Sequence, residues 1–397
     1  MTHVLTITNA LIFDGWSADL TEGSVLVRDG EIAAVGDVTT EGEVLDARGG
    51  VVTPGLVDAH FHAYAHSIDG LEDERAPLSY AALVGARRVR DALRRGFTTV
   101  RDVAGGDIGF ANAAAEGVIT APHYLYSGPA LSQTGGHGDP RRAEVDICFS
   151  HGHLNELVDG VDEVRRAVRE RLRTGAHCIK IMASGGVFSL TDPLAAPQYS
   201  PEEVRAAVDE ATRRGSYVAA HAYSAEAVTH AVTNGVRSVE HGNLIDAATA
   251  HLMADRDAYL VPTLAAYDAM DRRGAGLGLN AVSLAKNLEV LDHGKHAIEV
   301  AYEAGVPVGF GSDLMGHLDD DQLVGVRLQV EASSVLATLR AMTRTNAEII
   351  QDPRRGRVEE GAVGDVVIYP GNPFEHPELL WDDRPVRTVV RGGRPVD

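Results

Sequence analysis

The chain has 397 residues, of which 44% are hydrophobic and 23% are charged. This length exceeds one ordinary small domain, so we expect one large domain accompanied by a smaller one. The net charge of −21 argues against a nucleic-acid or anionic-membrane partner, because phosphate binding needs clustered Lys and Arg. No apolar run reaches the roughly 18 residues that a membrane-spanning helix requires. We therefore expect a cytoplasmic protein.

Both ends of the chain predict short strands without helical partners. Asp29 and Gly30 form a typical two-residue turn of a β-hairpin. We expect the segments 1–54 and 353–397 to pair with each other as one small β-sandwich domain, built from both chain ends. The predicted strands of this domain cover residues 4–12, 23–36 (the hairpin), 44–47, 364–369 and 386–393.

Between residues 55 and 352 the pattern changes to strands that alternate with helices. Gly96 and Gly215 follow cationic last turns as C-cap glycines, and Ser200 precedes Pro201 as an N-cap. Eight strand–helix units over about 260 residues predict an α/β fold, a (β/α)8 TIM-like barrel. The predicted strands are 51–60, 98–103, 123–127, 178–183, 217–222, 238–241, 259–263 and 306–311, and the predicted helices include 79–95, 161–174, 201–214, 225–234 and 281–304.

Two histidines stand two residues apart at the end of the first predicted barrel strand. Since side chains alternate with a period of two along a strand, His60 and His62 point to the same face. Two imidazoles on one face at a strand end are half of a metal site. Taken alone, the pair has an equally good structural interpretation, as polar residues that bond to backbone.

Four other predicted strands bring metal-compatible groups to the same rim. In a barrel, catalytic residues lie at the carboxyl ends of the strands. A single His, Asp or Lys at such a position has an ordinary structural explanation, such as a helix cap or an interior lysine that reaches solvent. The combination over five strand ends favours a metal site. The further candidates are Lys180, His221, His241 and Asp313.

Lys180 lies between Ile179 and Ile181, where burying an ammonium group is costly unless the group has a partner. A lysine with a lowered pKa is nucleophilic enough to take up carbon dioxide. The carbamate that results is an anionic, bidentate ligand that can bridge two metal ions. The sequence therefore indicates carbon dioxide as a small cofactor beside the metal.

Taken together, the motifs resemble the amidohydrolase superfamily over essentially the whole chain. Residues 54–62 (PGLVDAHFH) resemble its first-strand signature, and residues 359–367 (EEGAVGDVV) resemble its closing β-domain motif. Within the superfamily, residues 179–187 (IKIMASGGV), 221–223 (HAY) and 238–242 (SVEHG) are similar to the prolidase-like group. That group includes Xaa-Pro and Xaa-Arg dipeptidases and ochratoxinase-type carboxypeptidases.

The resemblance implies two divalent metal ions, with zinc as the expected metal, and a hydroxide that bridges them. In two-metal hydrolases the ions sit about 3.5–4 Å apart and lower the pKa of the shared water. Asp313 is expected to take the proton from this water and to pass it to the leaving amine. The implied ligands are His60, His62 and Asp313 for the more buried ion, His221 and His241 for the more exposed ion, and carboxylated Lys180 as the bridge.

The same resemblance assigns two residues to the substrate. His137 lies in a segment, 133–138 (QTGGHG), that is similar to a Gly-Gly-His-Gly loop of the prolidase-like group. We expect it to donate to the carbonyl oxygen in the transition state, although a histidine in a Gly-rich loop can also be an ordinary loop residue. Tyr223 lies two residues after His221 and faces the same way on a strand. Its hydroxyl is expected to bind a substrate carboxylate.

We therefore expect a binuclear metal-dependent hydrolase that cleaves the amide bond of a dipeptide or N-acyl amino acid, a small-molecule substrate. The alternative is hydrolysis of a cyclic amide, carbamate, lactone or phosphotriester, since the same hydroxide could attack any of these. A non-catalytic scaffold is disfavoured because no ligand of the set is missing. Assembly into a homo-oligomer is left open, since the sequence carries no legible interface pattern.

Overall fold

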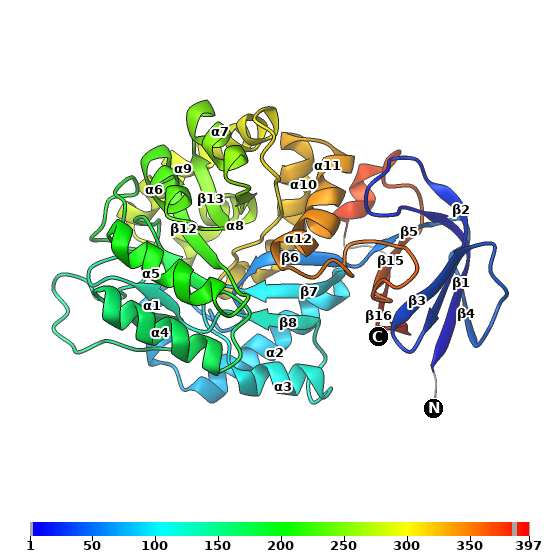
Figure 1. The fold of residues 1–397 in the computed structure, drawn as a ribbon, viewed down its shortest axis with the longest axis horizontal. Helices are drawn as coiled ribbons and strands as arrows, with labels where there is room; N and C mark the ends of the chain where they lie inside the picture. The colour runs from blue at the N-terminus through cyan, green and yellow to red at the C-terminus, as the bar shows by residue number, and fades with distance from the viewer. Residues whose placement is uncertain (1–2, 383–386, 397) are drawn as a thin grey trace.

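The computed structural model describes residues 3–382 and 387–396. Strands form three hydrogen-bonded sheets, and helices cover the two sheets of the larger part of the chain. Figure 1 shows the N-terminal strands and the C-terminal strands side by side at one end of the molecule, with the larger α/β part beside them. This mixed α/β arrangement agrees with the fold class that the sequence predicts.

The sheet at this end contains eight strands from both ends of the chain. Its order is β17-β16-β15-β5-β1-β2-β3, and β4 pairs with β1. The predicted pairing of the two ends is therefore confirmed, through the antiparallel contact between β15 and β5. Asp29 and Gly30 both have positive φ, 49° and 86°, as the predicted hairpin turn requires. The strands are β1 (Val4–Ile12), β2 (Thr21–Arg28), β3 (Glu31–Gly36), β4 (Glu43–Asp46), β5 (Val51–Pro54), β15 (Val366–Tyr369), β16 (Thr388–Arg391) and β17 (Arg394–Pro395); residue 386 of the last predicted strand lies outside the described residues.

The larger part of the chain contains two sheets of parallel strands. One has the order β6-β7-β8, and the other has the order β10-β9-β11-β12-β13-β14. Parallel pairing places the carboxyl ends of neighbouring strands at one edge, which is where the candidate site residues lie. The strands are β6 (Leu56–Phe61), β7 (Phe97–Asp102), β8 (His123–Tyr126), β9 (Ala130–Ser132), β10 (Asn155–Leu157), β11 (Ile179–Met182), β12 (Val218–Ser224), β13 (Ser238–Leu244) and β14 (Tyr259–Val261).

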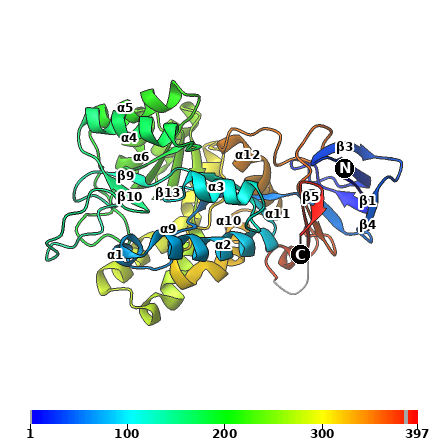
Figure 2. The same ribbon diagram turned by 90° about the horizontal axis from the view of Figure 1, so that it is seen from below.

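The helices pack their apolar sides against these sheets. All five predicted helices are present, with ends within two residues of the predicted positions. Ser200 accepts a hydrogen bond from the amide of Glu203 and forms a full capping box, as its place before Pro201 predicts. Figure 2 shows α2 and α3 side by side on one face. The α-helices are α1 (Gly70–Arg75), α2 (Leu78–Arg94), α3 (Ile108–Ala115), α4 (Val161–Arg173), α5 (Pro201–Thr212), α6 (Ala225–Thr233), α7 (Ala247–Asp255), α8 (Leu264–Ala269), α9 (Ala281–Glu303), α10 (Gln322–Ala332), α11 (Val335–Arg340) and α12 (Asn346–Ile349).

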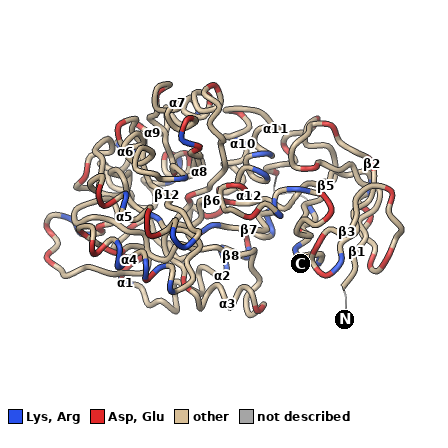
Figure 3. Tube along the Cα trace, in the orientation of Figure 1, with Lys and Arg blue, Asp and Glu red and all other residues tan. Residues whose placement is uncertain are grey.

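Charged residues of both signs are interspersed along the chain (Figure 3). On neighbouring helices α4 and α5, Arg165 and Arg169 each donate to Glu210 at 2.7 Å. The arginine side chains of these pairs are 31% and 63% exposed, whereas that of Glu210 is only 8% exposed. Within the described residues, no helix has the length and apolar character needed to cross a membrane.

The prediction of one strand over residues 51–60 is wrong, because the chain changes sheet at Gly55. β5 pairs with β15 in the terminal sheet, whereas β6 pairs with β7 in the larger part. The amide of Gly55 donates to Asp365 O at 2.8 Å, and a Cβ at this position would lie 2.1 Å from Thr98 Oγ1. Only glycine fits this crossing point.

The prediction of a regular strand over residues 306–311 is also wrong. Only Val308 makes a bridge, a parallel one to Leu260. The segment nevertheless lies between β14 and β6, because the amide of Gly309 donates to Leu260 O at 2.8 Å and the amide of Ala59 donates to Phe310 O at 3.0 Å. The bonds to the two neighbours are spread along the segment rather than forming a continuous ladder.

Candidate active site

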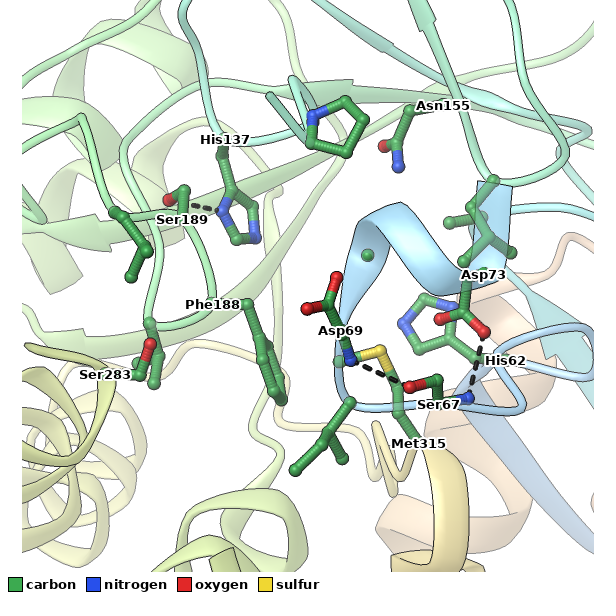
Figure 4. Close-up of a pocket in the computed structure, with 18 of the residues that line it drawn as sticks. His62, Ser67, Asp69, Asp73, His137, Asn155, Phe188, Ser189, Ser283 and Met315 are labelled. Carbon is green, nitrogen blue, oxygen red and sulfur yellow. Dashed lines mark hydrogen bonds between the residues drawn. The ribbon is translucent and has the colours of Figure 1, made fainter. Parts of the chain in front are cut away.

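A cavity of about 400 Å³ opens at the carboxyl ends of the parallel strands. In Figure 4, His137 and Ser189 lie on one side of it, His62, Asp73 and Met315 lie on the other, and Phe188 and Asp69 lie between them. The structure therefore gathers in one cavity side chains that are up to 255 positions apart in the sequence, from His60 to Met315. All eight residues predicted from the sequence line it: His60, His62, His137, Lys180, His221, Tyr223, His241 and Asp313.

Three of these residues converge on one point at the base of the cavity. His60 Nε2 lies 3.2 Å from His62 Nε2, and Asp313 Oδ1 lies 3.2 Å from the first nitrogen and 2.9 Å from the second. Two ring nitrogens and a carboxylate oxygen at such distances form a donor set that fits a divalent cation. Burial raises the pKa of Asp313, but the larger opposing effect of His60 and His62 brings this pKa well below its ordinary value.

Glu240 fixes the orientation of His60, and the sequence did not single it out. Its Oε2 accepts a hydrogen bond from His60 Nδ1 at 2.8 Å, which fixes the direction in which His60 Nε2 faces Asp313. Its Oε1 accepts from Arg101 Nη2 at 2.7 Å and from Ser238 Oγ at 2.8 Å. Burial raises the pKa of Glu240, but Arg101 and His60 lower it well below its ordinary value.

Lys180 is 3% exposed and lies on β11. Burial lowers the pKa of its ammonium group to about 8, against the opposing attraction of Glu240 and Asp313. A substantial neutral fraction near pH 8 is what uptake of carbon dioxide requires. The environment of Lys180 is therefore compatible with the expected carbamate.

His221 and His241 lie on neighbouring strands, with ring centroids 4.5 Å apart. His221 Nε2 is 3.0 Å from Gly185 O, and His241 Nδ1 is 2.8 Å from the hydroxyl oxygens of Thr263 and Tyr267. Among the described residues, no hydrogen bond engages the other nitrogen of either ring. Burial lowers the pKa of both rings well below the usual value, so both are neutral and suited to bind a cation.

His137 stacks on His221, with ring centroids 4.1 Å apart. Its Nδ1 lies 2.9 Å from Ser189 Oγ, and its amide donates to Gln198 Oε1 at 3.0 Å. Burial lowers the pKa of His137 to about 4. The ring is therefore a fixed, neutral group beside the cluster rather than a mobile loop residue.

Tyr223 also faces the cavity, as its spacing from His221 predicts. Its ring stacks on His241 with centroids 5.1 Å apart, and its hydroxyl accepts a hydrogen bond from Tyr267 at 3.0 Å. Tyr267, on α8, thus contacts both Tyr223 and His241. It was missed because no strand-end pattern includes it.

Arg88 of α2 holds two loops beside the cluster. It donates to Ala65 O at 2.6 Å, to Gly316 O at 3.2 Å and to Leu314 O. These carbonyls follow His62 and Asp313 closely in the chain. Arg88 is 2% exposed, and its three backbone acceptors satisfy part of a cation that burial otherwise disfavours.

Other buried charged residues that sequence reasoning missed share one signal. Each lies inside a strand that is buried almost throughout, where burial of a charge demands a partner. Asp58 accepts from the amides of His60 and Ser312, both at 3.1 Å, and so ties β6 to the segment that carries Asp313. A search for charged residues within the predicted barrel strands would have found this set, which comprises Asp58, Arg101, Asp102 and Glu240.

Comparison with known proteins agrees with the resemblance to the amidohydrolase superfamily. The sequence model of the Amidohydrolase family matches residues 51–396. Ochratoxinase of Aspergillus niger is 33% identical over 365 residues, which cover 87% of this chain and 75% of that protein.

Solved structures are similar over almost the whole chain. A prolidase complexed with N-methylphosphonate-L-proline is 38% identical, with a TM-score of 0.96 and 99% of each chain covered. A Xaa-Pro dipeptidase with bound methionine is 26% identical, with a TM-score of 0.88, covering 99% of this chain and all of that one (100%). The resemblance to the prolidase-like group is thus confirmed, and the chain belongs to the amidohydrolase family as an enzyme that hydrolyses amide bonds.

Proposed function

We propose that this protein is a binuclear metal-dependent hydrolase that cleaves the amide bond of a dipeptide or N-acyl amino acid. The observation that carries the proposal is the convergence of His60 Nε2, His62 Nε2 and Asp313 Oδ1 at the base of the cavity. Prolidase and ochratoxinase among the relatives support an amide or peptide substrate of small size.

The donor set supports two cation positions. Bound there, two divalent ions, with zinc expected, would activate a water molecule and polarise the scissile carbonyl. The other ring nitrogens of His221 and His241 face no hydrogen-bonding partner among the described residues, which leaves them available for a second ion. The proposed ligands are His60, His62 and Asp313 for one ion, His221 and His241 for the other, and Lys180 as its carbamate between them.

Proton transfer and substrate orientation fall to the protein's own side chains. Asp313 is held ionised by the adjacent imidazoles, so it can take a proton from the attacking water and deliver it to the leaving nitrogen. His137, which stacks on His221, is proposed to donate a hydrogen bond from Nε2 to the carbonyl oxygen as negative charge develops there; its contact with Ser189 supports a fixed position. Tyr223 is proposed to donate its hydroxyl proton to a substrate carboxylate.

The fold proposal completes this assignment. We propose that the strands of residues 55–352 close into a (β/α)8 barrel, and that residues 1–54 and 353–397 form a β-sandwich domain. Support comes from the bonds that join residues 308–310 to both β14 and β6, and from the shared sheet of the two chain ends.

The test is a metal titration combined with a substrate panel. Purified protein is stripped with a chelator, reloaded with zinc and assayed on dipeptides and N-acyl amino acids with varied C-terminal residues. We expect two metal equivalents for each chain and activity that returns with them. The proposal fails if the protein binds no metal and if stripped and reloaded samples behave alike on the whole panel. A His137→Gln variant should keep both metal equivalents and lose at least about a hundredfold in kcat.

A further inference from the structure

Residues 184–200, which we call the 184–200 loop, connect β11 to α5 and lie against the histidine cluster. Gly185 O accepts from His221 Nε2 at 3.0 Å, and Ser189 Oγ lies 2.9 Å from His137 Nδ1. A Cβ on Gly186 would lie 2.0 Å from His137 Cε1, so the ring rests directly on the loop backbone. The position of His137 therefore depends on the main chain of this loop.

Lys286, from α9, holds that main chain in place. Its Nζ donates to Gly186 O at 2.9 Å, Ser189 O at 2.7 Å and Asp192 O at 2.6 Å. An ammonium group has three N–H donors, so all of them are used. The carboxylate of Asp192 lies 3.7 Å from Nζ, beyond hydrogen-bond distance. The side chain of Lys286 is only 14% exposed, so water competes little for these bonds.

The carboxylate of Asp192 makes a second connection to His137. Its Oδ2 accepts from Gln198 Nε2 at 2.7 Å, and Gln198 Oε1 accepts from the amide of His137 at 3.0 Å. The loop therefore fixes both the backbone and the ring of His137. Lys286 binds the carbonyls of Ser189, which contacts the ring of His137, and of Asp192, which reaches the backbone of His137 through Gln198.

The hydroxyl of Ser189 has three polar neighbours but only one proton to donate. The neighbours are Gly186 N at 3.3 Å, Gly186 O at 3.1 Å and His137 Nδ1 at 2.9 Å. Gly186 O already accepts from Lys286, and the positive charge beside that carbonyl repels the hydroxyl proton. The hydroxyl can donate to Gly186 O or to His137 Nδ1, and the charge of Lys286 favours His137 Nδ1, while the amide of Gly186 donates to Oγ.

We propose that Lys286 is a positioning residue that sets the tautomer of His137 through Ser189. A neutral imidazole that accepts a hydrogen bond at Nδ1 carries its own proton at Nε2. Only this tautomer can donate from Nε2 to the scissile carbonyl oxygen. The inference rests on the proposed role of His137, but the tautomer can be measured without substrate, so the two proposals fail separately.

The direct test is nuclear magnetic resonance of the zinc-loaded protein with ¹⁵N- and ¹³C-labelled histidine. The His137→Gln variant identifies the signals of this ring. We expect the Nε2–H form in the wild type and a shift toward the Nδ1–H form in Lys286→Met and in Ser189→Ala. Lys295→Met is the matched control, since Lys295 lies on the same helix but pairs with exposed Glu331. An Nε2–H form that persists in either Lys286→Met or Ser189→Ala overturns the proposal.

Kinetics on the best dipeptide of the panel separate this role from general support of the fold. Lys286→Met should lower kcat by about tenfold or more and leave KM within about twofold, because a donor to the transition state is weakened. In a Ser189→Ala background the same substitution should add less than about twofold. Independent, multiplying losses contradict the proposal. If Lys286→Met does not fold, Lys286→Arg takes its place, with a partial shift toward the Nδ1–H form expected and the absence of any shift contradicting the proposal.

Discussion

Replacing Glu240 with Gln removes one buried negative charge and keeps the shape of the side chain. The carboxylate accepts from Arg101 Nη2 at 2.7 Å, from Ser238 Oγ at 2.8 Å and from His60 Nδ1 at 2.8 Å. An amide has one acceptor oxygen and one NH₂ group, so it cannot serve both sides of this arrangement. In Glu240→Gln, the NH₂ group must face either the guanidinium of Arg101 or the N–H of His60, and both are donors.

The magnitude has two parts. Arg101 and Glu240 are both fully buried, with side chains 0% exposed, and breaking a buried ion pair on one side costs about 3–5 kcal/mol of unfolding free energy. His60 also loses the acceptor that fixes its tautomer and direction. Loss of such a partner behind a metal ligand lowers metal affinity by about 10–100-fold. We therefore expect a less stable protein that also binds zinc more weakly.

Two assays separate the effects. Urea unfolding of the metal-free protein measures the first, and competition with a chromophoric chelator measures the second. The double variant Arg101→Leu/Glu240→Gln removes the uncompensated cation, so it should recover stability but not zinc affinity. Glu331→Gln, in an exposed pair with Lys295, is the control and should change unfolding free energy by less than about 1 kcal/mol. Wild-type zinc affinity in Glu240→Gln would refute the reasoning.

Three further outcomes are expected from the same structure. Lys180→Ala should abolish activity and remove one of two metal equivalents in elemental analysis; unchanged metal content would contradict its bridging role. Burial raises the pKa of Asp73 to about 8, so the folded state holds this proton more tightly and loses stability as pH rises. The unfolding free energy of Asp73→Asn, measured with urea, should therefore fall less between about pH 5 and pH 8 than that of the wild type. Parallel pH dependences of the two unfolding free energies would contradict this. Arg88→Met leaves three backbone carbonyls beside the site without their donor and should lower the unfolding free energy by about 2–5 kcal/mol in thermal unfolding. Arg90→Met, on the more exposed side of the same helix, should cost little. Equal effects of the two substitutions would contradict the role of Arg88 in holding the two loops.

Local patterns predicted the elements of the fold well, because each pattern acts within a few residues. The Asp29–Gly30 turn and the Ser200 capping box are satisfied where the sequence places them. The errors at residues 51–60 and 306–311 have a different origin. Whether an apolar run stays in one sheet depends on its neighbours in space, and the crossing at Gly55 is set by close contact with Thr98 and Asp365.

The site was predictable to the extent that it follows the strand-end rule. That rule gathers the ligand candidates because parallel strands end at one edge. It does not predict the side chains that helices contribute to the site. Lys286 lies 100 positions from Gly186, and its contact with the loop follows from the packing of α9, not from any motif. Tyr267 likewise reaches Tyr223 and His241 from α8.

The pair Glu240 and His241 shows where the alternation argument itself needs correction. Successive side chains of a regular strand point to opposite faces, so two neighbours should not both serve one site. Yet Glu240 contacts His60 on one side of its ring, and the ring of His241 lies 4.9 Å from the ring of His60. His241 achieves this with a left-handed backbone, φ 79°, which Asp313 shares with φ 53°. Such conformations cost about 1–3 kcal/mol each in non-glycine residues and persist only where the surroundings enforce them. At Asp313 the enforcing bond is visible, since its amide donates to His60 O at 2.9 Å. The left-handed backbone lets His241 face the same site as its neighbour Glu240, and Asp313 shares this conformation. Glycine is the usual sign of a left-handed position in a sequence, and neither residue is glycine, so the sequence pattern does not reveal this.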